Sequence, residues 1–495
     1  MPGPGNVGER VRNLRLTRRL SQAQLAGHDL SDSYISLIES GKRTPTPTVL
    51  RMLAERLGCT PEYLAEGVEP EQRAHLEVRE RHAHLALLAG DPATAEAGFD
   101  DVIDRSDDPD LTSRARWGRA RALEELGRTG QAITLFEELR EQAERDPGRA
   151  SWLPPVIALA RCYHAVGDLG QAIALGERAL DRLRGLGLDV GVEHAEVGRI
   201  LLLAYVDRSD PERAHALGRR LLVSAPDESP ADAYQRASIR ALEGGAIGDS
   251  LHLADKALAA RTEGTPPQSR ARLDLAAAKA LLRGVPPFSV PPSIADTGMG
   301  GTFAVAGSAE LARPRAEGTP EAAAEAFELL RQTTSLDGVE GTEATIAKAR
   351  ALVLMGDPSQ AIAGLEEFLE TGMALAAPTA DGSPTAVPEP VVTPRPDAGL
   401  PARTHKTVLA RLVLARARIA QGDRTAAQVV LGIAAEQLAG LAPGRTAAGL
   451  FREQGELFEL VGDPDSAAAA YRRGLEAVGL CSARSQAADR DLGRV

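Results

Sequence analysis

The chain has 495 residues, of which 43% are hydrophobic but only 3% are aromatic. Alanine and leucine must therefore fill the core, and this favours close-packed helices over sheets. The first residues, MPGPGNVGER, contain no apolar segment of a secretory signal, and no apolar run is long enough to span a membrane. Cys59, Cys162 and Cys481 are odd in number and far apart, which fits neither a disulfide framework nor a metal site. We therefore expect a cytoplasmic protein with several domains or one long repeat array.

Positive charge is concentrated near the N-terminus. Residues 1–65 hold nine Arg or Lys and six Asp or Glu, a net charge of +3, so the other 430 residues carry −15 in a chain whose total is −12. Five arginines lie between positions 10 and 19, and Lys42 and Arg43 follow. A basic segment on an acidic body predicts a phosphate-rich partner such as nucleic acid. The alternative is that this segment is only a small structural bundle.

Residues 8–67 predict five short helices. Ser21 opens the second, and Gln24 three residues later completes a capping-box pattern. Ser31 opens the third helix, Pro47 opens the fourth, and a last turn follows at Pro61–Leu64. The side chains expected on the buried faces are Val11, Leu14, Leu16, Tyr34, Ile35, Ile38, Val49, Leu50, Leu53 and Leu57.

The run LSQAQLA…LSDSYISLIESGKRTPT resembles the Cro/phage-repressor (XRE) helix-turn-helix family, and the resemblance covers about residues 8–66. It implies a five-helix lambda-repressor-like domain whose third helix enters the major groove of double-stranded DNA. It also implies a homodimer that reads two half-sites. The residues that the resemblance assigns to DNA binding are Gln22, Ser31, Asp32, Ser33, Tyr34, Ser36, Leu37, Lys42 and Arg43.

These residues divide by role in the family pattern. Gln22 holds a phosphate at the start of the second helix, the residues after Ser31 face the bases, and Tyr34, Lys42 and Arg43 grip the backbone. Asp32 stands where the family often has glutamine, and its carboxylate can accept from cytosine N4, which favours a C·G pair. The turn between the second and third helices is one residue shorter here than is usual in the family.

From about residue 73 onward one pattern recurs. A helix ends in Gly-Asp or a close variant, and an alanine follows five residues after the glycine. Glycine permits the left-handed turn, aspartate caps the next helix, and the small residue lets the paired helices approach closely. A fainter copy lies near Gly248-Asp249. The clear copies are Gly90-Asp91…Ala95, Gly127-Arg128…Ala132, Gly167-Asp168…Ala172, Ser209-Asp210…Ala214, Gly356-Asp357…Ala361, Gly422-Asp423…Ala427 and Gly462-Asp463…Ala467.

This pattern resembles the tetratricopeptide repeat, a unit of two helices in about 34 residues. The resemblance implies about nine helix pairs across residues 73–480, stacked into a right-handed α-solenoid with a concave face. Two segments without helical periodicity interrupt it, at 284–318 and at the Pro-rich 374–402, and both are expected to be flexible. Repeats are thus predicted at 73–283, 319–373 and 403–480, before a disordered tail at 481–495. An alternative for the interruptions is a regulated segment that a partner binds or processes.

A recurring arginine is the candidate binding element of the array. In the tetratricopeptide family, the position six residues before the closing glycine points into the concave groove. Here it is occupied by Arg121, Arg161, Arg350 and Arg416. A row of guanidinium groups would suit an acidic peptide, a partner protein or a phosphorylated ligand. The alternative is that these arginines are solvated and paired locally, for example Arg121 with Glu125.

No catalytic or cofactor-binding motif stands out. The chain has no GxxxxGK[ST] loop, no HExxH and no GxGxxG after a strand. His75, His82 and His84 are not spaced four residues apart, which favours a solvated helix face over a metal site. Cys162 and His164 fall on different faces of a helix, so they do not form a nucleophile–base pair. We expect no enzyme activity, no metal and no cofactor.

These observations favour a sequence-specific transcriptional regulator whose array senses a ligand or partner and mediates self-association. The layout resembles long XRE–tetratricopeptide regulators of GC-rich Gram-positive bacteria, including those governing development or secondary metabolism. Two alternatives remain: a protein-interaction scaffold with a vestigial DNA module, and a peptide-pheromone receptor. Many such receptors hold the peptide backbone with asparagine, and the only asparagines here, Asn6 and Asn13, lie outside the repeats.

Overall fold

The computed structural model describes residues 7–66, 70–106, 108–223, 229–262, 267–289, 317–331, 333, 336, 338–374 and 400–480. Within these residues every regular element is an α-helix, and no strand occurs. The predicted all-α fold class is confirmed. The chain divides into two compact units, Met1–Asp146 and Pro147–Val495.

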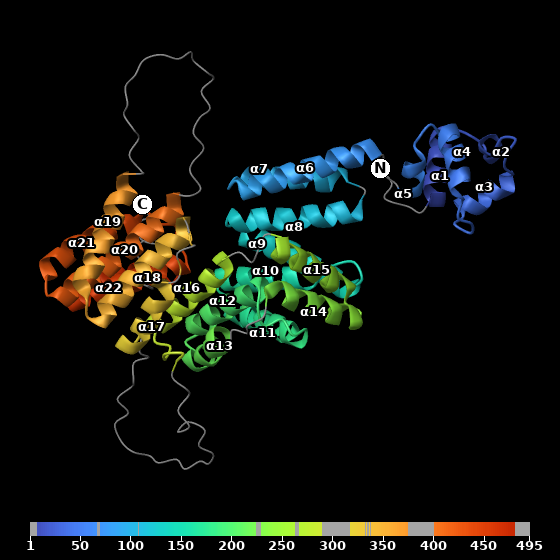
Figure 1. Cartoon of the computed structure of the whole chain (residues 1–495). Helices are drawn as coiled ribbons and strands as arrows, with labels where there is room; N and C mark the ends of the chain where they lie inside the picture. The colour runs from blue at the N-terminus through green and yellow to red at the C-terminus, as the bar shows by residue number, and fades with distance from the viewer. Residues whose placement is uncertain are drawn as a thin grey trace, which may run out of the picture. The chain divides into compact units, whose positions relative to one another are not determined.

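The first unit holds the five short helices of the N-terminal domain and two longer helix pairs (Figure 1). In the pairs, successive helices pack against each other along the chain. The helices of this unit are α1 (Val7–Thr17), α2 (Gln22–Ala26), α3 (Asp32–Glu39), α4 (Pro47–Leu57), α5 (Pro61–Glu66), α6 (Pro70–Leu88), α7 (Pro92–Arg105), α8 (Pro109–Glu125) and α9 (Thr129–Arg145).

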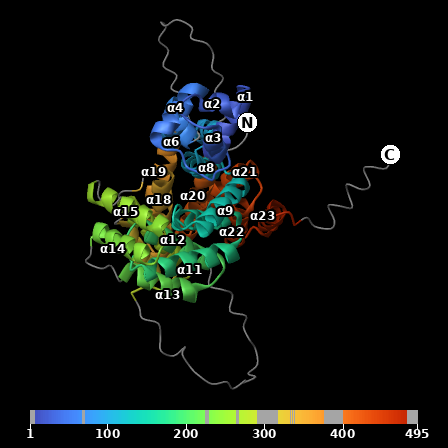
Figure 2. The ribbon, with the colours of Figure 1, turned by 90° about the vertical axis from the view of Figure 1, so that its right-hand side faces the viewer.

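The second unit is also built of antiparallel helix pairs, seen from a second direction in Figure 2. The first helices of neighbouring pairs also pack together, as α16 does with α18 and α18 with α20. Its helices are α10 (Leu153–Val166), α11 (Leu169–Gly185), α12 (Val192–Asp207), α13 (Pro211–Val223), α14 (Pro230–Glu243), α15 (Ile247–Thr262), α16 (Pro267–Leu282), α17 (Pro320–Arg331), α18 (Gly338–Met355), α19 (Pro358–Ala374), α20 (Leu400–Gln421), α21 (Arg424–Ala439), α22 (Arg445–Val461) and α23 (Pro464–Ala477).

Seven of the nine helix pairs from α6–α7 to α22–α23 turn at the positions that the sequence pattern predicted. All seven predicted turn positions have a positive φ, between 60° at Ser209 and 92° at Gly462. The aspartates cap the next helix as expected; for instance, the Asp168 carboxylate accepts from the backbone N–H of Gln171 at 3.1 Å. The seven alanines that follow the turns are at most 2% exposed. Local sequence therefore determines where each pair turns and where its helices touch.

Ser209 takes the left-handed conformation without being a glycine, and its side chain is exposed. We expect Ser209→Gly to stabilise the second unit by roughly 0.5–1 kcal/mol, because glycine removes the Cβ penalty but gains freedom in the unfolded chain. Thermal unfolding of the full chain would show this as a small rise in Tm. Ser209→Ala is the matched control and should leave Tm unchanged or lower, since alanine keeps the Cβ. Equal Tm values for the two variants would contradict the left-handed backbone conformation of Ser209.

The fainter copy predicted near Gly248-Asp249 corresponds to the α14–α15 pair, but Gly248 and Asp249 themselves do not form its turn. The turn lies earlier, at Gly245 with φ 78°, and Gly248 is buried inside the first turn of α15. A Cβ on Gly248 would lie 2.2 Å from the Ala150 carbonyl oxygen. The buried Asp249 carboxylate accepts from the Ser151 hydroxyl at 2.7 Å and from the Trp152 backbone N–H at 2.8 Å. This glycine thus serves close packing of α15 on the α9–α10 connection, where the local pattern suggested a helix end.

The start of the first predicted interruption is also corrected. Residues 284–289 are described, and Val285 and Phe288 are 2% and 1% exposed. The Phe288 ring stacks on His215 with 6.1 Å between ring centroids, and its backbone N–H donates to Glu325 at 3.1 Å. Tertiary packing therefore fixes these residues despite their lack of helical periodicity. Both ends of the Pro-rich segment predicted at 374–402 are also corrected, because Ala374 ends α19 and residues 400–402 belong to α20. The rest of the segments predicted to be flexible, 290–316, 375–399 and 481–495, lies outside the described residues.

In the N-terminal domain, most predicted core residues are buried or half-buried, including Val11, Ile35, Ile38, Leu53 and Leu57. The prediction for Leu16 is wrong, because its side chain is 54% exposed. Leu16 lies five residues after Val11, which places it well away from the Val11–Leu14 face of a helix.

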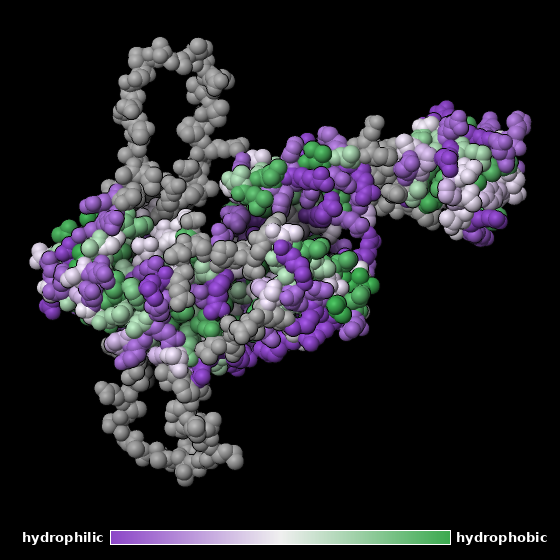
Figure 3. Space-filling view, viewed as in Figure 1, coloured by the Kyte–Doolittle hydropathy of each residue, from purple (hydrophilic) through white to green (hydrophobic). Residues whose placement is uncertain are grey.

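An exposed aliphatic surface lies on the second unit along α14 and α15. Green residues reach the surface over this pair in Figure 3, and the two helices lie side by side in both ribbon views. Scattered apolar side chains are normal on a protein surface, whereas a contiguous set is common at interfaces. The exposed side chains of this surface are Ile239, Leu242, Ile247, Leu251 and Leu258.

Candidate nucleic-acid interface

The third helix, α3, separates into two faces. Ile35, Ile38 and Glu39 are buried against the domain core. The exposed positions recur at helical spacing along the opposite face and are Asp32, Ser33, Ser36, Leu37 and Ser40. Four of these five were assigned to DNA by the resemblance. A short helix with one polar, open face and a rigidly buried opposite face can enter a major groove without losing core contacts.

The two helix starts at the site are capped as predicted. The Ser21 hydroxyl accepts from the backbone N–H of Gln24 at 3.1 Å, while the Gln24 side chain accepts from the backbone N–H of Ser21 at 2.8 Å. The Ser31 hydroxyl accepts from the backbone N–H of Tyr34 at 3.2 Å. Ser31 therefore fixes the start of α3, a role that the family resemblance did not assign to it.

The short turn between α2 and α3 is held from α4. The Arg56 guanidinium donates to the carbonyl oxygens of Leu25 and Ala26, the first at 3.0 Å, and forms an ion pair with Asp29. Gly27 within this turn has φ 61°, which favours glycine. Arg56 thus satisfies the carbonyl groups at the end of α2 and positions α3 relative to it. Sequence reasoning missed this residue because it lies about 30 positions downstream in the chain.

A buried ion pair joins α1 to α3. The Arg15 guanidinium donates to both Glu39 carboxylate oxygens, at 2.6 and 3.0 Å, and the two side chains are 11% and 5% exposed. The Gln22 amide donates to the same carboxylate at 2.8 Å. Burial alone would raise the pKa of Glu39, but the hydrogen bonds from Arg15 and Gln22 outweigh it and hold the pKa below its usual value. The Gln22 side chain, predicted to hold a phosphate, is therefore oriented by Glu39.

Lys42 and Arg43 are exposed just beyond the end of α3. Their backbone N–H groups donate to the Leu37 carbonyl oxygen at 3.0 and 3.2 Å, and Gly41 between helix and pair has φ 69°. The Arg43 guanidinium lies over the Tyr34 ring, 5.3 Å from its centroid. The structure thus brings Arg43, which follows the end of α3, back to Tyr34 in the first turn of the helix. The DNA-backbone role assigned to Tyr34, Lys42 and Arg43 remains a prediction.

The arginines of α1 serve the fold more than the sequence suggested. Arg10 donates to the Leu64 and Ala65 carbonyl oxygens at 3.1 and 2.7 Å, Arg18 donates to the Gly58 carbonyl at 3.0 Å, and Arg15 binds Glu39. Arg12 and Arg19 are exposed. Part of the positive charge of this segment therefore stabilises the five-helix bundle.

The four predicted groove arginines all have carboxylate partners. Arg121 pairs with Glu124 at 3.6 Å, one position from the expected Glu125. Arg161 pairs with Glu196 at 3.1 Å. In the second unit, Arg350 and Arg416 share Glu453, at 3.3 and 3.9 Å, and Arg416 also pairs with Glu317. Only Arg121 has a partner close to it in the sequence, because the other three pair with carboxylates on other segments of the chain. The role of the four arginines in ligand binding remains a prediction.

The histidines and the cysteine considered as metal ligands or catalytic groups do not form a common site. His75, His82 and His84 are on α6, and none of them has a metal-ligating neighbour set. The His164 ring nitrogen lies 2.9 Å from an Asp207 oxygen, while Cys162 is fully buried. In the parts of the chain that the structure describes, no three metal-ligating side chains gather around a common point, and no helix has the length and apolar character of a membrane span.

Comparison with known proteins decides the character of the first domain. Residues 11–64 match the helix-turn-helix family model, which coincides with α1–α5. The N-terminal domain is a helix-turn-helix domain. No curated protein matches the chain.

Three solved structures illustrate the similarity of the chain to known proteins. PlcR of Bacillus thuringiensis, solved with the peptide PapR7 and DNA, is 17% identical over 52% of this chain and 95% of its own, with a TM-score of 0.25. A Rap protein solved with competence and sporulation factor is 11% identical over 82% and 98%, with a TM-score of 0.34. Human IFIT1, solved as a dimer with m7Gppp-AAAA, is 14% identical over 95% and 94%, with a TM-score of 0.29. Superpositions this weak add nothing to the helix-turn-helix assignment.

Proposed function

We propose that the chain is a sequence-specific, DNA-binding transcriptional regulator whose helix-pair array senses a ligand or a partner protein. The observation that carries the proposal is the helix-turn-helix domain with its open α3 face. Asp32, Ser33, Ser36 and Leu37 would contact base edges, and the Leu37 side chain, 39% exposed, would suit a thymine methyl group. Such a regulator works in the cytoplasm beside the genome, and its domain type speaks against an enzyme.

We further propose that the regulator acts as a homodimer on paired half-sites. Residues 1–65 carry a net charge of +3 from nine basic and six acidic residues. One copy can neutralise few phosphates, so a second copy would supply the missing affinity. A ligand on the array could then change DNA affinity by favouring one spacing of the two domains.

Selection of bound sequences from random duplex DNA by the full-length protein tests the function. We expect one enriched motif, arranged as a palindrome if the protein is a dimer. A Ser33→Ala/Ser36→Ala/Leu37→Ala variant should lose or change that motif, because these positions are exposed and alanine keeps the helix. Thr48→Ala, an exposed position on α4, is the matched control and should leave the motif intact.

Three outcomes separate the proposals. Enrichment without a palindrome, together with a monomer in sedimentation, would reject the homodimer alone. The same motif from both the triple variant and the wild type would reject the α3 assignment. No enrichment at low salt, with or without cell extract, would favour a protein-interaction scaffold, whereas enrichment that requires a peptide fraction would favour a peptide receptor.

A further inference from the structure

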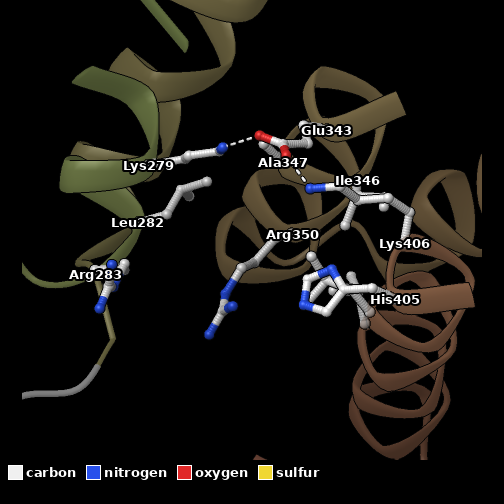
Figure 4. Close-up of a pocket in the computed structure, with 11 residues that line it drawn as sticks. Lys279, Leu282, Arg283, Glu343, Ile346, Ala347, Arg350, His405 and Lys406 are labelled. Carbon is white, nitrogen blue, oxygen red and sulfur yellow. Dashed lines mark hydrogen bonds and ion pairs between the residues drawn. The ribbon is translucent and has the colours of Figure 1, made fainter. Parts of the chain in front are cut away.

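A cavity of about 220 Å³ lies within the second unit between α16, α18 and α20. These are the first helices of three successive pairs, and α18 packs against both of the others. Figure 4 shows Lys279 and Lys406 reaching Glu343 from opposite sides, with Arg350 and His405 below them. A molecule in this cavity would contact three repeats at once.

Positive charge outnumbers negative charge around the cavity. Lys279, Arg283, Arg350 and Lys406 line it together with a single carboxylate, Glu343. The two lysines form ion pairs with different oxygens of that carboxylate. The arginines have their own partners, because Arg283 pairs with Asp207 at 2.7 Å and Arg350 with Glu453 at 3.3 Å. The lysine pair therefore has one positive charge more than its shared carboxylate can balance.

The excess charge is poorly solvated. The side chains of Lys279 and Lys406 are 32% and 16% exposed. Burial lowers the pKa of Lys279 to about 8; the nearby Arg199 and Arg283 add to the effect, and Glu340 and Asp207 oppose it. Burial, with a further contribution from Lys279, lowers the pKa of Lys406 to about 8. A second anion beside the lysines would relieve this repulsion.

Composition does not explain the lysine pair. The chain contains 52 arginines and only five lysines, and two of the five meet at one carboxylate. Lysine presents a compact charge on a flexible stem, whereas arginine presents a planar fork. Lysine therefore suits a site that binds anions of different shapes better than arginine does.

The rest of the wall is aliphatic. Leu282, Ile346 and Val413 are buried and line the cavity, and Leu409 joins them. Ligand sites typically combine such apolar walls with a few convergent charged groups. A ligand that matches both would carry a negative charge at one end and a small apolar group at the other.

We propose that this cavity binds a small organic anion, a carboxylate or phosphate ester, with its charge between Lys279 and Lys406 and its apolar part on Leu282, Ile346 and Leu409. This site would give the sensing role proposed above a class of ligand. Binding of the anion does not depend on the proposed function; only its effect on DNA binding does. By bridging three repeats, the ligand would favour one arrangement of α16, α18 and α20.

Calorimetry on the full-length protein with defined probes tests the site. The probes are phenyl phosphate and benzoate, with phenol as the neutral analogue and inorganic phosphate as the anion without an apolar group. We expect both organic anions to bind at least about tenfold more tightly than either control. Lys279→Met/Lys406→Met should abolish binding, whereas Glu343→Gln should tighten it several-fold, because it removes the competing carboxylate. Lys348→Met, a half-buried lysine on α18 outside the cavity lining, should bind as the wild type does.

The outcomes decide the proposal even if the double variant fails to fold. Absence of probe binding, binding of phenol equal to that of phenyl phosphate, or weaker anion binding by Glu343→Gln would each overturn it. A preference for only one of benzoate and phenyl phosphate would support the site and identify which anion it takes. DNA selection repeated with phenyl phosphate separates the two proposals. Lysine-dependent binding of the probe by a protein that selects no DNA motif would keep the site and reject the regulator.

Discussion

Replacing Arg15 with alanine is expected to destabilise the helix-turn-helix domain by about 3 kcal/mol, because it leaves the buried Glu39 carboxylate without its cation. Glu39 is 5% exposed and accepts two hydrogen bonds from Arg15. Gln22 would remain as its one neutral donor at 2.8 Å, which limits the loss. Hydrogen exchange of the full-length protein would report the change as faster exchange of the α3 amides of Ile35 and Ile38.

An Arg15→Met/Glu39→Met variant is the control for this prediction. It removes both charges and fills the space with apolar atoms, so it should recover most of the lost stability. The free energy of opening, measured by hydrogen exchange, is the quantity to compare. If it differs by less than about 1 kcal/mol between Arg15→Ala and the wild type, water already solvates the ion pair.

The same network predicts how stability depends on pH. The pKa of Glu39 is lower in the folded protein than its ordinary value of 4.5. The unfolded chain therefore binds this proton first as pH falls, so the stabilisation is complete above about pH 4.5 and is lost as pH falls through the folded-state pKa. In Arg15→Ala, the buried Glu39 carboxyl has lost the guanidinium, so its pKa rises. The difference in stability between the wild type and this variant should therefore become smaller below about pH 5. A deficit that stays constant from about pH 7 to about pH 4 would contradict this account.

Replacing Arg43 with alanine is expected to weaken binding to every DNA sequence about tenfold at moderate salt, without changing the preferred motif. Arg43 is exposed and its guanidinium lies 5.3 Å from the centroid of the Tyr34 ring, so its charge is held beside the first turn of α3. Loss of one phosphate contact should also reduce the slope of log K against log salt by about 0.9. Fluorescence anisotropy with a labelled duplex at several salt concentrations measures both quantities.

Arg51→Ala is the matched control for Arg43→Ala. It removes the same charge from an exposed position of the same domain, on α4. We expect a roughly twofold loss of affinity from the long-range field alone, and little change in the salt slope. If the two variants lose affinity and slope equally, Arg43 makes no direct phosphate contact.

The turns of the array could be predicted because their causes are local. A positive φ, a capping carboxylate and a small residue at the helix contact each depend on one residue and its near neighbours. Even Ser209 follows the rule, since its position in the repeat outweighs its poor suitability for φ 60°. Gly248 and Asp249 differ from the repeat turns, because these two residues pack against a segment about 98 residues away in the chain.

The charge networks could not be predicted in the same way. Arg15 meets Glu39 across 24 positions, and Lys279 and Lys406 meet Glu343 across 64 and 63. Nothing in the spacing of these residues identifies their partners, which depend on how helices from different parts of the chain pack. One local signal was available, because Glu39 lies four residues after Ile35 and beside Ile38, on the apolar face of α3. A charged residue on a buried helix face indicates that another part of the chain supplies an opposite charge or a hydrogen-bond partner.

The separation of the two faces of α3 also affects how the protein can evolve. The side chains that hold the helix in place, Ile35, Ile38 and Glu39, share no position with those that face outward. Substitutions at Ser33, Ser36 and Leu37 can therefore accumulate at little cost in stability. On the proposed function, duplicated genes that carry this domain could change their DNA preference through substitutions at these three positions. Common descent would remain visible in the three unchanged buried residues.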